Sequence, residues 1–247
     1  MLNHFLSSLA YRAKWAKFGV YYWDSLKLDT VRIGKHWWVN LSFPEPERPI
    51  HEWEFGKIVF EDCYRLRNIN HSVRTVLDIG ANIGLFALAA RHHFGSALIQ
   101  CYEPNSALES YLAAHCSAVN ARHRIEAIGS ESGAVDLHRD QADSLHSTTK
   151  LNANGAIRQR AFSEAVNELG EVDLVKLDCE GAEWDIFKDP NPWRHIRSLV
   201  MEYHLWAKPN STIETVKWSL RDLGFTEIQI EPSNNGPWGF AFARKRY

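Results

Sequence analysis

Residues 75–84 read Thr-Val-Leu-Asp-Ile-Gly-Ala-Asn-Ile-Gly and decide the fold of this chain. A short apolar strand ends beside Asp78, a glycine-bracketed turn follows, and the helical run Leu85–Phe94 comes next. Gly80 has no Cβ, so a ligand can approach the backbone closely, and Gly84 lets the helix start tight against the strand. The stretch therefore predicts a site for a nucleotide-shaped cofactor.

The spacing of these glycines argues against a dinucleotide. A pyrophosphate site is expected to show Gly-x-Gly-x-x-Gly, whereas this chain has Gly80-x-x-x-Gly84 with Ala81 and Asn82 between. Asp78 beside the turn repels phosphate but suits a cation and an amino acid ammonium. S-adenosylmethionine carries a sulfonium and an ammonium and no phosphate, so we predict it as the cofactor.

A second acidic residue supports a nucleoside site. The apolar run Ala97–Tyr102 is typical of a buried strand, and it ends at Glu103, followed by Pro104, about twenty residues beyond the turn. A carboxylate at this place can accept hydrogen bonds from both ribose hydroxyls. The pair of signals predicts the cofactor site more strongly than either signal alone.

Strands and helices alternate from Thr75 onward, which predicts a parallel, doubly wound sheet. The expected elements are strand Thr75–Ile79, helix Leu85–Phe94, strand Ala97–Tyr102, helix Ser106–Val119, strand Arg124–Ile128 ending at Gly129, strand Gly133–Leu137, strand Val172–Leu177 and strand Arg197–Met201. A helix over Ser211–Leu223 is expected to carry a capping box of Ser211 and Glu214. The strands Phe225–Ile230 and Phe240–Arg244 are expected to close the chain as a hairpin, with Trp238 in a loop placed to wall the pocket.

The strand Val172–Leu177 runs into Asp178-Cys179-Glu180-Gly181-Ala182-Glu183. In open α/β sheets the ligand sits at the carboxyl ends of the strands, so Asp178 and Glu180 should face the same crevice as Asp78 and Glu103. They are predicted to orient a substrate hydroxyl, take its proton or shape the sulfonium site. Asp185 is interpreted as a first-turn helix acid, and for Glu183 that interpretation and a functional one both stay open.

The strand Arg197–Met201 brings Glu202, Tyr203 and His204 to the same rim. A histidine beside a carboxylate is a reasonable general base, because its ordinary pKa lies near neutrality. A hydrogen-bonded structural histidine is the alternative. The polar segment between His138 and Asn154, which includes Ser144 and Thr149, is either a substrate loop or an ordinary surface loop.

The first seventy residues form an extension with a different composition. Val31–Ile33 and Trp37–Leu41 predict a hairpin, Phe43–Pro49 a proline-rich connector, and Glu52–Leu66 a segment that is helical at its end. Before them, basic residues and large aromatics alternate in a predicted first helix. That helix is expected to rest on a membrane surface, to cap the substrate pocket, or to pack on the core or on a partner subunit.

The bulk properties exclude several classes of protein. With 247 residues the chain fits one large α/β domain, and a net charge of −2 argues against nucleic acid as a partner. No run approaches the length of a membrane span. The four cysteines lack Cys-x-x-Cys spacing and are expected to be reduced core thiols of a cytoplasmic protein. No cluster of histidine and aspartate has convincing ligand spacing, so no metal is predicted.

Taken together, these residues resemble the FkbM-type methyltransferases, a branch of the class I S-adenosylmethionine-dependent enzymes. The resemblance covers roughly Tyr64 to the C-terminus. It rests on five blocks, Val76–Gly84, Tyr102-Glu103-Pro104, Ala127-Ile128-Gly129 with Gly133, Val175–Glu183 and Met201-Glu202-Tyr203-His204. The block Asp178-x-Glu-Gly-Ala-Glu183 is the most specific of these.

The resemblance implies a Rossmann-like, mostly parallel seven-stranded sheet with helices on both faces and an antiparallel last strand. The expected methyltransferase domain spans 71–247, and residues 1–70 form the N-terminal helical and hairpin extension. By similarity, the cofactor is held by Asp78, Gly80, Ala81, Asn82, Gly84, Glu103, Pro104, Ile128 and Asp178. The residues implied to face the methyl acceptor are Asp178, Glu180, Glu202 and His204.

The implied reaction is O-methylation of a small-molecule hydroxyl, on a sugar or a polyketide-like natural product. An N-methyltransferase on the same fold is the first alternative, but Asp178-Cys179-Glu180-Gly181 stands where amino-methylating enzymes carry an Asn-Pro-Pro-Tyr type of tetrad. The second alternative is a non-catalytic nucleoside-binding or membrane-peripheral protein. Intact acids at every expected position argue against it.

Overall fold

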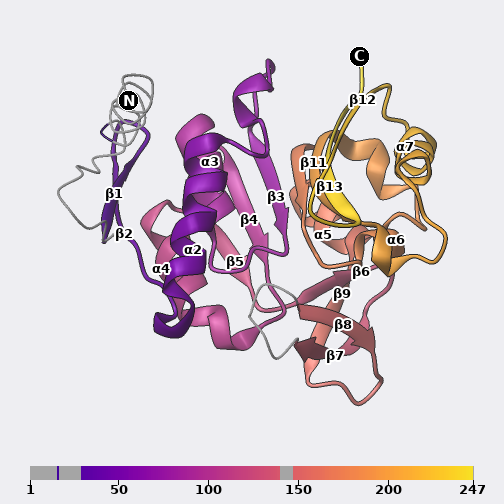
Figure 1. Ribbon diagram of the computed structural model, residues 1–247, viewed down its shortest axis with the longest axis horizontal. Coiled ribbons are helices and arrows are strands. Elements are labelled where there is room, and N and C mark those ends of the chain that lie inside the picture. The colour runs from indigo at the N-terminus through magenta and orange to yellow at the C-terminus, as the bar shows by residue number, and fades with distance from the viewer. Residues whose placement is uncertain (1–15, 17–28, 140–146, 247) are drawn as a thin grey trace.

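The computed structural model describes residue 16 and residues 29–139 and 147–246. The predicted first helix and Ser144 of the polar segment lie outside the described residues, apart from Ala16, which is helical. Figure 1 shows a central sheet with helices on either side and a smaller sheet beside it. Within the described part of the chain, no helix combines the length and the apolar character needed to cross a membrane.

The central sheet has seven strands in the order β12-β13-β11-β10-β3-β4-β5. Neighbouring strands are parallel except that β13 runs antiparallel to both β11 and β12. The bounds are β3 Thr75–Ile79, β4 Leu98–Tyr102, β5 Arg122–Arg124, β10 Val172–Leu177, β11 Ile196–His204, β12 Glu227–Pro232 and β13 Trp238–Arg244. The expected sheet with an antiparallel last strand is confirmed, and the direction of strand addition reverses between β3 and β10.

Helices cover both faces of this sheet (Figure 1). The helices are α2 Arg48–Phe55, α3 Leu85–His93, α4 Glu109–Ala118, α5 Phe162–Leu169, α6 Glu183–Ile186 and α7 Ile213–Asp222. Alternate residues of each strand point to opposite faces, so Val76 of β3 joins the core formed with α3 and α4, whereas Leu77 joins the core formed with α5 and α7. Both faces are buried, as a parallel sheet requires.

The predicted strand Arg124–Ile128 is wrong, because the chain divides there between two sheets. β5 ends at Arg124 on the edge of the central sheet, and β6 (Ala127–Gly129) pairs with β9 (Ile157–Ala161) in a four-stranded sheet of order β6-β9-β7-β8. Glu126, between them, forms an ion pair with Arg160 of β9 at 2.6 Å. This contact links the break in the chain to the second sheet.

The segment between His138 and Asn154 is not wholly a loop. β7 (Gly133–Arg139) and β8 (Ser147–Leu151) form an antiparallel hairpin, in which Leu137 pairs with Thr149. β-branched threonines suit a strand whatever their polarity, so composition alone misled the interpretation. β9 and α5, which follow this hairpin, had no counterpart among the predicted elements.

The part of the extension that the structure describes packs on the domain. β1 (Thr30–Ile33) and β2 (Trp37–Asn40) form the predicted hairpin, and Val31, Ile33 and Val39 lie in the same core as α3 and α4. α2 begins at Arg48, earlier than predicted, because Pro49 fits the first turn of a helix. α2 continues into the π-helical segment η2 (Gly56–Glu61).

Short 3-10 turns complete the connections, and one predicted cap is wrong. The turns are η1 Glu45–Glu47, η3 Leu66–Asn68, η4 Ser106–Leu108, η5 Pro192–His195 and η6 Leu205–Ala207. The N-cap of α7 is Thr212, whose hydroxyl accepts from the Thr215 N–H, and not Ser211 paired with Glu214. The Ser211 hydroxyl instead donates to the Leu205 carbonyl at 2.7 Å.

Candidate functional site

A cavity of about 740 Å³ opens at the carboxyl ends of β3, β4, β10 and β11. This is where the direction of strand addition reverses, the usual place for a ligand in an open α/β sheet. Ten of the twelve predicted site residues line it, namely Gly80, Ala81, Asn82, Glu103, Pro104, Ile128, Asp178, Glu180, Glu202 and His204. Glu103, Asp178 and Glu180 thus face one crevice, whereas Asp78, which was predicted to share it, does not line it.

The turn after β3 is tight against the end of β10. Gly80 has a φ of +75°, and a Cβ added there would lie 1.7 Å from the carbonyl oxygen of Asp178. The close approach that requires glycine here is to the protein's own backbone, and the approach of a ligand to Gly80, which lines the cavity, stays a prediction. Asn82 also takes a left-handed conformation, with a φ of +49°. The turn thus presents its backbone to the cavity in one fixed shape.

Glu103 joins this turn to the end of β4. Its Oε2 accepts from the Asn82 N–H and its Oε1 from the Asn105 N–H, both at 2.8 Å. Each carboxylate oxygen has a second lone pair, so Glu103 can still accept from a ligand. Burial raises the pKa of Glu103, while the two backbone hydrogen bonds oppose the shift. Its position on the cavity fits the predicted contact with ribose hydroxyls.

Two predicted cofactor residues, Asp78 and Gly84, do not line the cavity. The Asp78 carboxylate is fully buried and lies 3.4 Å from the Lys176 ammonium. Gly84, at a φ of +88°, is packed against α4, where an added Cβ would lie 3.1 Å from Leu112. Both residues support the turn on the side away from the cavity, so direct contact between either of them and a cofactor is not supported.

Lys176 is a buried cation that the sequence reasoning missed. Its ammonium lies 3.4 Å from Asp78 and 3.8 Å from Asp178, and it donates to the Gly80 carbonyl. Burial disfavours its charge, but the two aspartates outweigh that cost and raise the pKa of Lys176. The available signal was a lysine inside the apolar run of β10, which needs a buried partner.

Asp178 stands at the end of β10 and is anchored from two sides. Its Oδ2 accepts from the Tyr64 hydroxyl at 2.8 Å and lies 3.8 Å from Lys176. Burial and the charge of Asp178 raise the pKa of Tyr64, so this phenol remains a donor. The anchoring fixes the Asp178 carboxylate on the cavity beside the glycine turn.

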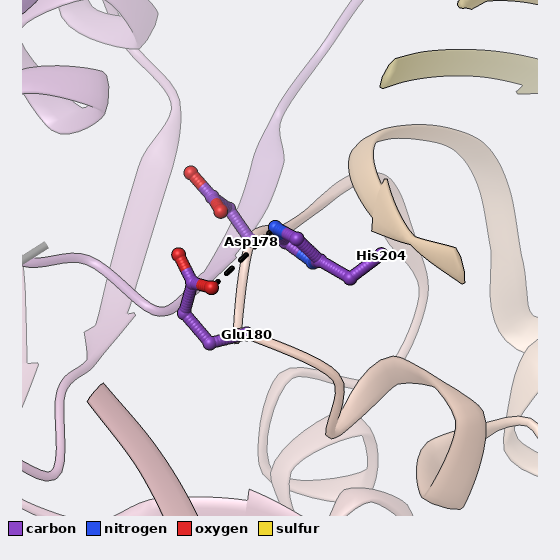
Figure 2. Close-up of side chains that lie close together, drawn as sticks. All are labelled: Asp178, Glu180 and His204. Atoms are coloured by element: carbon purple, nitrogen blue, oxygen red, sulfur yellow. Dashed lines mark ion pairs between the residues drawn. The ribbon is translucent and has the colours of Figure 1, made fainter. Parts of the chain in front are cut away.

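Glu180, Glu202 and His204 form the other end of the cavity. Nε2 of His204 lies 3.6 Å from Glu180 and 3.5 Å from Glu202. Glu180 has a φ of +51°, an uncommon value for a residue other than glycine. Figure 2 shows the Glu180 carboxylate turned toward the His204 ring, with Asp178 close to both.

Glu183 orients His204 through the ring nitrogen Nδ1 and the main-chain N–H. The Glu183 side chain is fully buried, and its Oε1 contacts the His204 Nδ1 at 3.1 Å and accepts from the His204 main-chain N–H at 2.9 Å. Of the two interpretations left open for Glu183, the structure favours the one in which it serves the site. Asp185, by contrast, accepts from the Ser130 N–H away from the cavity.

The charges of this group are interdependent. Burial disfavours a charged His204, but contacts with Glu183, Glu202 and Glu180 outweigh burial and raise its pKa to about 11. Burial and the nearby Asp178 raise the pKa of Glu202, while His204 opposes that shift. The carboxylates around His204 thus favour its protonated form.

The match to a domain family settles what kind of protein this is. Residues 78–226, more than half of the chain, match the family described as the methyltransferase FkbM domain. This chain belongs to the FkbM methyltransferase family. The matched range contains the glycine turn, Glu103 and the whole Asp178–His204 group, so the FkbM domain holds both ends of the cavity except for side chains such as Tyr64 and Trp238.

Individual relatives are more distant. Methyltransferase sdnD of Sordaria araneosa is 25% identical over 212 residues, which make up 69% of this chain and 80% of that protein. Among solved structures, the precorrin-6y C5,15-methyltransferase of Geobacter metallireducens has a TM-score of 0.45 at 13% identity, covering 73% of this chain and 85% of that one. The METTL16 MTase domain has a TM-score of 0.47 at 14% identity, covering 96% and 80%.

Aromatic side chains wall the cavity of this FkbM family member. Trp206 follows β11, Trp238 and Phe240 come from β13, and Trp53 reaches in from α2. Trp53 and Trp206 are half-exposed or more despite their size. Trp238 was predicted to wall the pocket and does so. The other three were missed, because the places of Trp53 and Trp206 depend on how α2 and η6 fold over the rim and that of Phe240 on the pairing of β13 with β11.

Proposed function

We propose that this FkbM methyltransferase transfers a methyl group from S-adenosylmethionine to a hydroxyl of a small molecule such as a sugar or a polyketide-like natural product. The observation that carries the proposal is the division of one cavity into two ends. The glycine turn and Glu103 form an end suited to a nucleoside. Glu180, Glu202 and His204 form an end suited to a hydroxyl that must lose its proton.

The cofactor end fits the donor by charge as well as by shape. Glu103 offers lone pairs to ribose hydroxyls, and Asp178 lies where a positive charge is favoured. The turn from Gly80 to Ile83 and the apolar Ile128 leave no basic side chain on this stretch for a phosphate. A cationic nucleoside without phosphate suits this end better than a dinucleotide does.

The acceptor end supplies groups for deprotonation and alignment. An alcohol becomes a good nucleophile as its proton leaves. Glu202 takes that proton, the oxygen forms a bond to the methyl carbon, and the carbon–sulfur bond breaks with its electron pair going to sulfur. Holding the acceptor in line with that bond is the main further contribution of the protein. Trp206, Trp238 and Phe240 exclude water from the reacting atoms.

A titration with S-adenosylmethionine and a turnover assay test the proposal together. We expect calorimetry to show binding by the full chain and at least about tenfold weaker binding by Glu103→Gln, because hydrogen bonds to a charged group contribute about 1.5–3 kcal/mol. Glu109→Gln, at the exposed start of α4, is the matched control. Turnover with glycosides and polyketide alcohols is then followed as release of the demethylated cofactor.

In the same assay we expect Glu202→Gln to lower turnover by about 10²–10⁴-fold, the usual contribution of an acid–base group, with cofactor affinity kept. Absence of binding to the cofactor would overturn the methyltransferase chemistry proposed for this cavity. Binding without any effect of Glu202→Gln on turnover would remove Glu202 as the proton acceptor. Transfer only to amines would replace the hydroxyl acceptor.

A further inference from the structure

Three side chains that could ligate a metal ion, two carboxylates and one imidazole, meet at the cavity. Asp178 and Glu180 follow β10, His204 ends β11, and one ligand atom from each lies within 4.8 Å of the others. Figure 2 shows the two carboxylates and the imidazole gathered around a common space. With metal–ligand bonds of about 2.1 Å, ligand atoms lie about 3 Å apart when adjacent and about 4.2 Å apart when opposite. Closing of the three ligand atoms to these separations around one ion would complete the site.

The buried histidine aims its outer nitrogen into this space. Nε2 of His204 lies 3.5 and 3.6 Å from the carboxylates of Glu202 and Glu180, longer than an ordinary hydrogen bond, and the side chain is 4% exposed. Atoms at these separations can surround one ion that takes the place of the proton on Nε2.

An outer carboxylate holds the histidine in that orientation. Glu183 contacts Nδ1 and the main-chain N–H of His204, which leaves Nε2 as the nitrogen that faces the cavity. Metal-binding histidines in proteins are generally held this way, through a carboxylate or carbonyl on the nitrogen that does not bind the metal. The contact of Glu183 with His204 is independent of the three ligand atoms, since it is made on the side of the ring away from Nε2.

We propose that Asp178, Glu180 and His204 bind a divalent first-row metal ion, with Mn²⁺ as the representative. Imidazole favours such ions over Mg²⁺, whereas carboxylates accept both. The inference deepens the proposed function and rests on it, because an ion here would bind the acceptor oxygen and ease loss of its proton to Glu202. Sequence spacing predicted no metal, because the ligands come from two strands 24 positions apart, from Glu180 to His204.

Manganese binding to the full chain, treated with EDTA and dialysed, tests this site. Titration with MnCl₂ is followed by the electron paramagnetic resonance signal of the free ion. We expect saturable binding that Asp178→Asn, Glu180→Gln and His204→Gln each weaken by more than about tenfold, and that Glu183→Gln weakens by about 10- to 100-fold. The matched control is His195→Gln, because His195 is exposed and pairs with Glu171 on the surface.

The outcomes separate this proposal from the proposed function. Calorimetry with S-adenosylmethionine is run on the same EDTA-treated protein and on each variant. Cofactor binding without saturable manganese binding, or manganese binding that the three ligand variants leave unchanged, overturns the metal site and keeps the methyltransferase proposal. Manganese binding without cofactor binding supports the metal site and overturns the proposed function. Retained cofactor binding shows that Glu180→Gln and His204→Gln are folded, and the melting temperature shows it for Asp178→Asn, because Asp178 also lies at the cofactor end.

Discussion

At the scale of single residues, Lys176 makes a strong prediction. The Lys176 ammonium lies between the carboxylates of Asp178 and the buried Asp78. Lys176→Met removes the positive charge that both carboxylates share. We expect the free energy of unfolding to fall by about 3–5 kcal/mol, the usual effect of breaking a buried pair from one side. Urea denaturation measures it. Lys188→Met is the control, because Lys188 is 72% exposed and its surface pair with Asp185 contributes at most about 1 kcal/mol. Equal losses in both variants would contradict the argument.

The sequence predicted correctly which residues lie at the ends of neighbouring strands. It did not predict in which direction their side chains point. Glu180, Glu202 and His204 were placed on one rim because the carboxyl ends of neighbouring parallel strands share an edge. Glu183 and Asp185 are equivalent in sequence, as acids of one helical turn. Only the position of β11 decides that Glu183 meets His204. For the same reason, Asp78 was assigned to the cofactor although it points toward Lys176.

At the scale of elements, the β3–α3 turn depends on its contact with β10. Gly80→Ala would place a Cβ 1.7 Å from the Asp178 carbonyl oxygen, at a φ of +75° that side chains rarely adopt. We expect a loss of stability well above about 1 kcal/mol together with weaker S-adenosylmethionine binding, because the turn must move away from β10. The melting temperature and calorimetry measure the two effects.

Gly95→Ala provides the control for this turn, since nothing lies within 4 Å of a Cβ added at Gly95 and its φ is not in the left-handed region. We expect its stability to change by less than about 1 kcal/mol in either direction. If Gly80→Ala behaves like Gly95→Ala, the turn does not require the close approach seen in the structure.

Elements with strong local signals were predictable and elements decided by long-range pairing were not. Apolar runs and turn residues in the sequence predict β3, β10 and the closing hairpin. The break between β5 and β6 spans only Ile125 and Glu126, and it depends on Arg160 of a strand far along the chain. The sequence of β8 is typical of a polar loop because it is rich in hydroxyl side chains. It forms a strand because it pairs with β7. Sheet partners, rather than local preference, determine such segments.

At the scale of the whole molecule, the two cores hold the site between them. Residues of β3 and β10 alternate between the core with α3 and α4 and the core with α5 and α7, so both faces fix the strand ends that carry Gly80 and Asp178. The β1–β2 hairpin extends the first core, and Tyr64 reaches from that side to Asp178. Residues before the matched domain therefore contribute to the site as well as to the core.

Stability of the whole molecule should depend on His93, at the end of α3. Burial, with repulsion from His92 and Arg67, lowers the pKa of His93 to about 4 in the folded state, against about 6.5 when unfolded. Between these values the unfolded chain holds a proton that the folded chain does not. The contribution of His93 is therefore fully present above about pH 6.5 and is lost as the pH falls toward 4.

We expect the wild-type chain to lose more free energy of unfolding between about pH 7.5 and about pH 5 than His93→Asn does, as measured by urea denaturation at both values. Comparing the two chains isolates His93, because buried carboxylates whose pKa is raised, such as Glu54 and Glu103, act in the opposite direction in both. His36→Asn, in the exposed turn between β1 and β2, should keep the wild-type dependence. If the free energy of unfolding of His93→Asn falls with pH as much as that of the wild type, the prediction is wrong. The imidazole would then take up its proton in the folded chain without opening the end of α3.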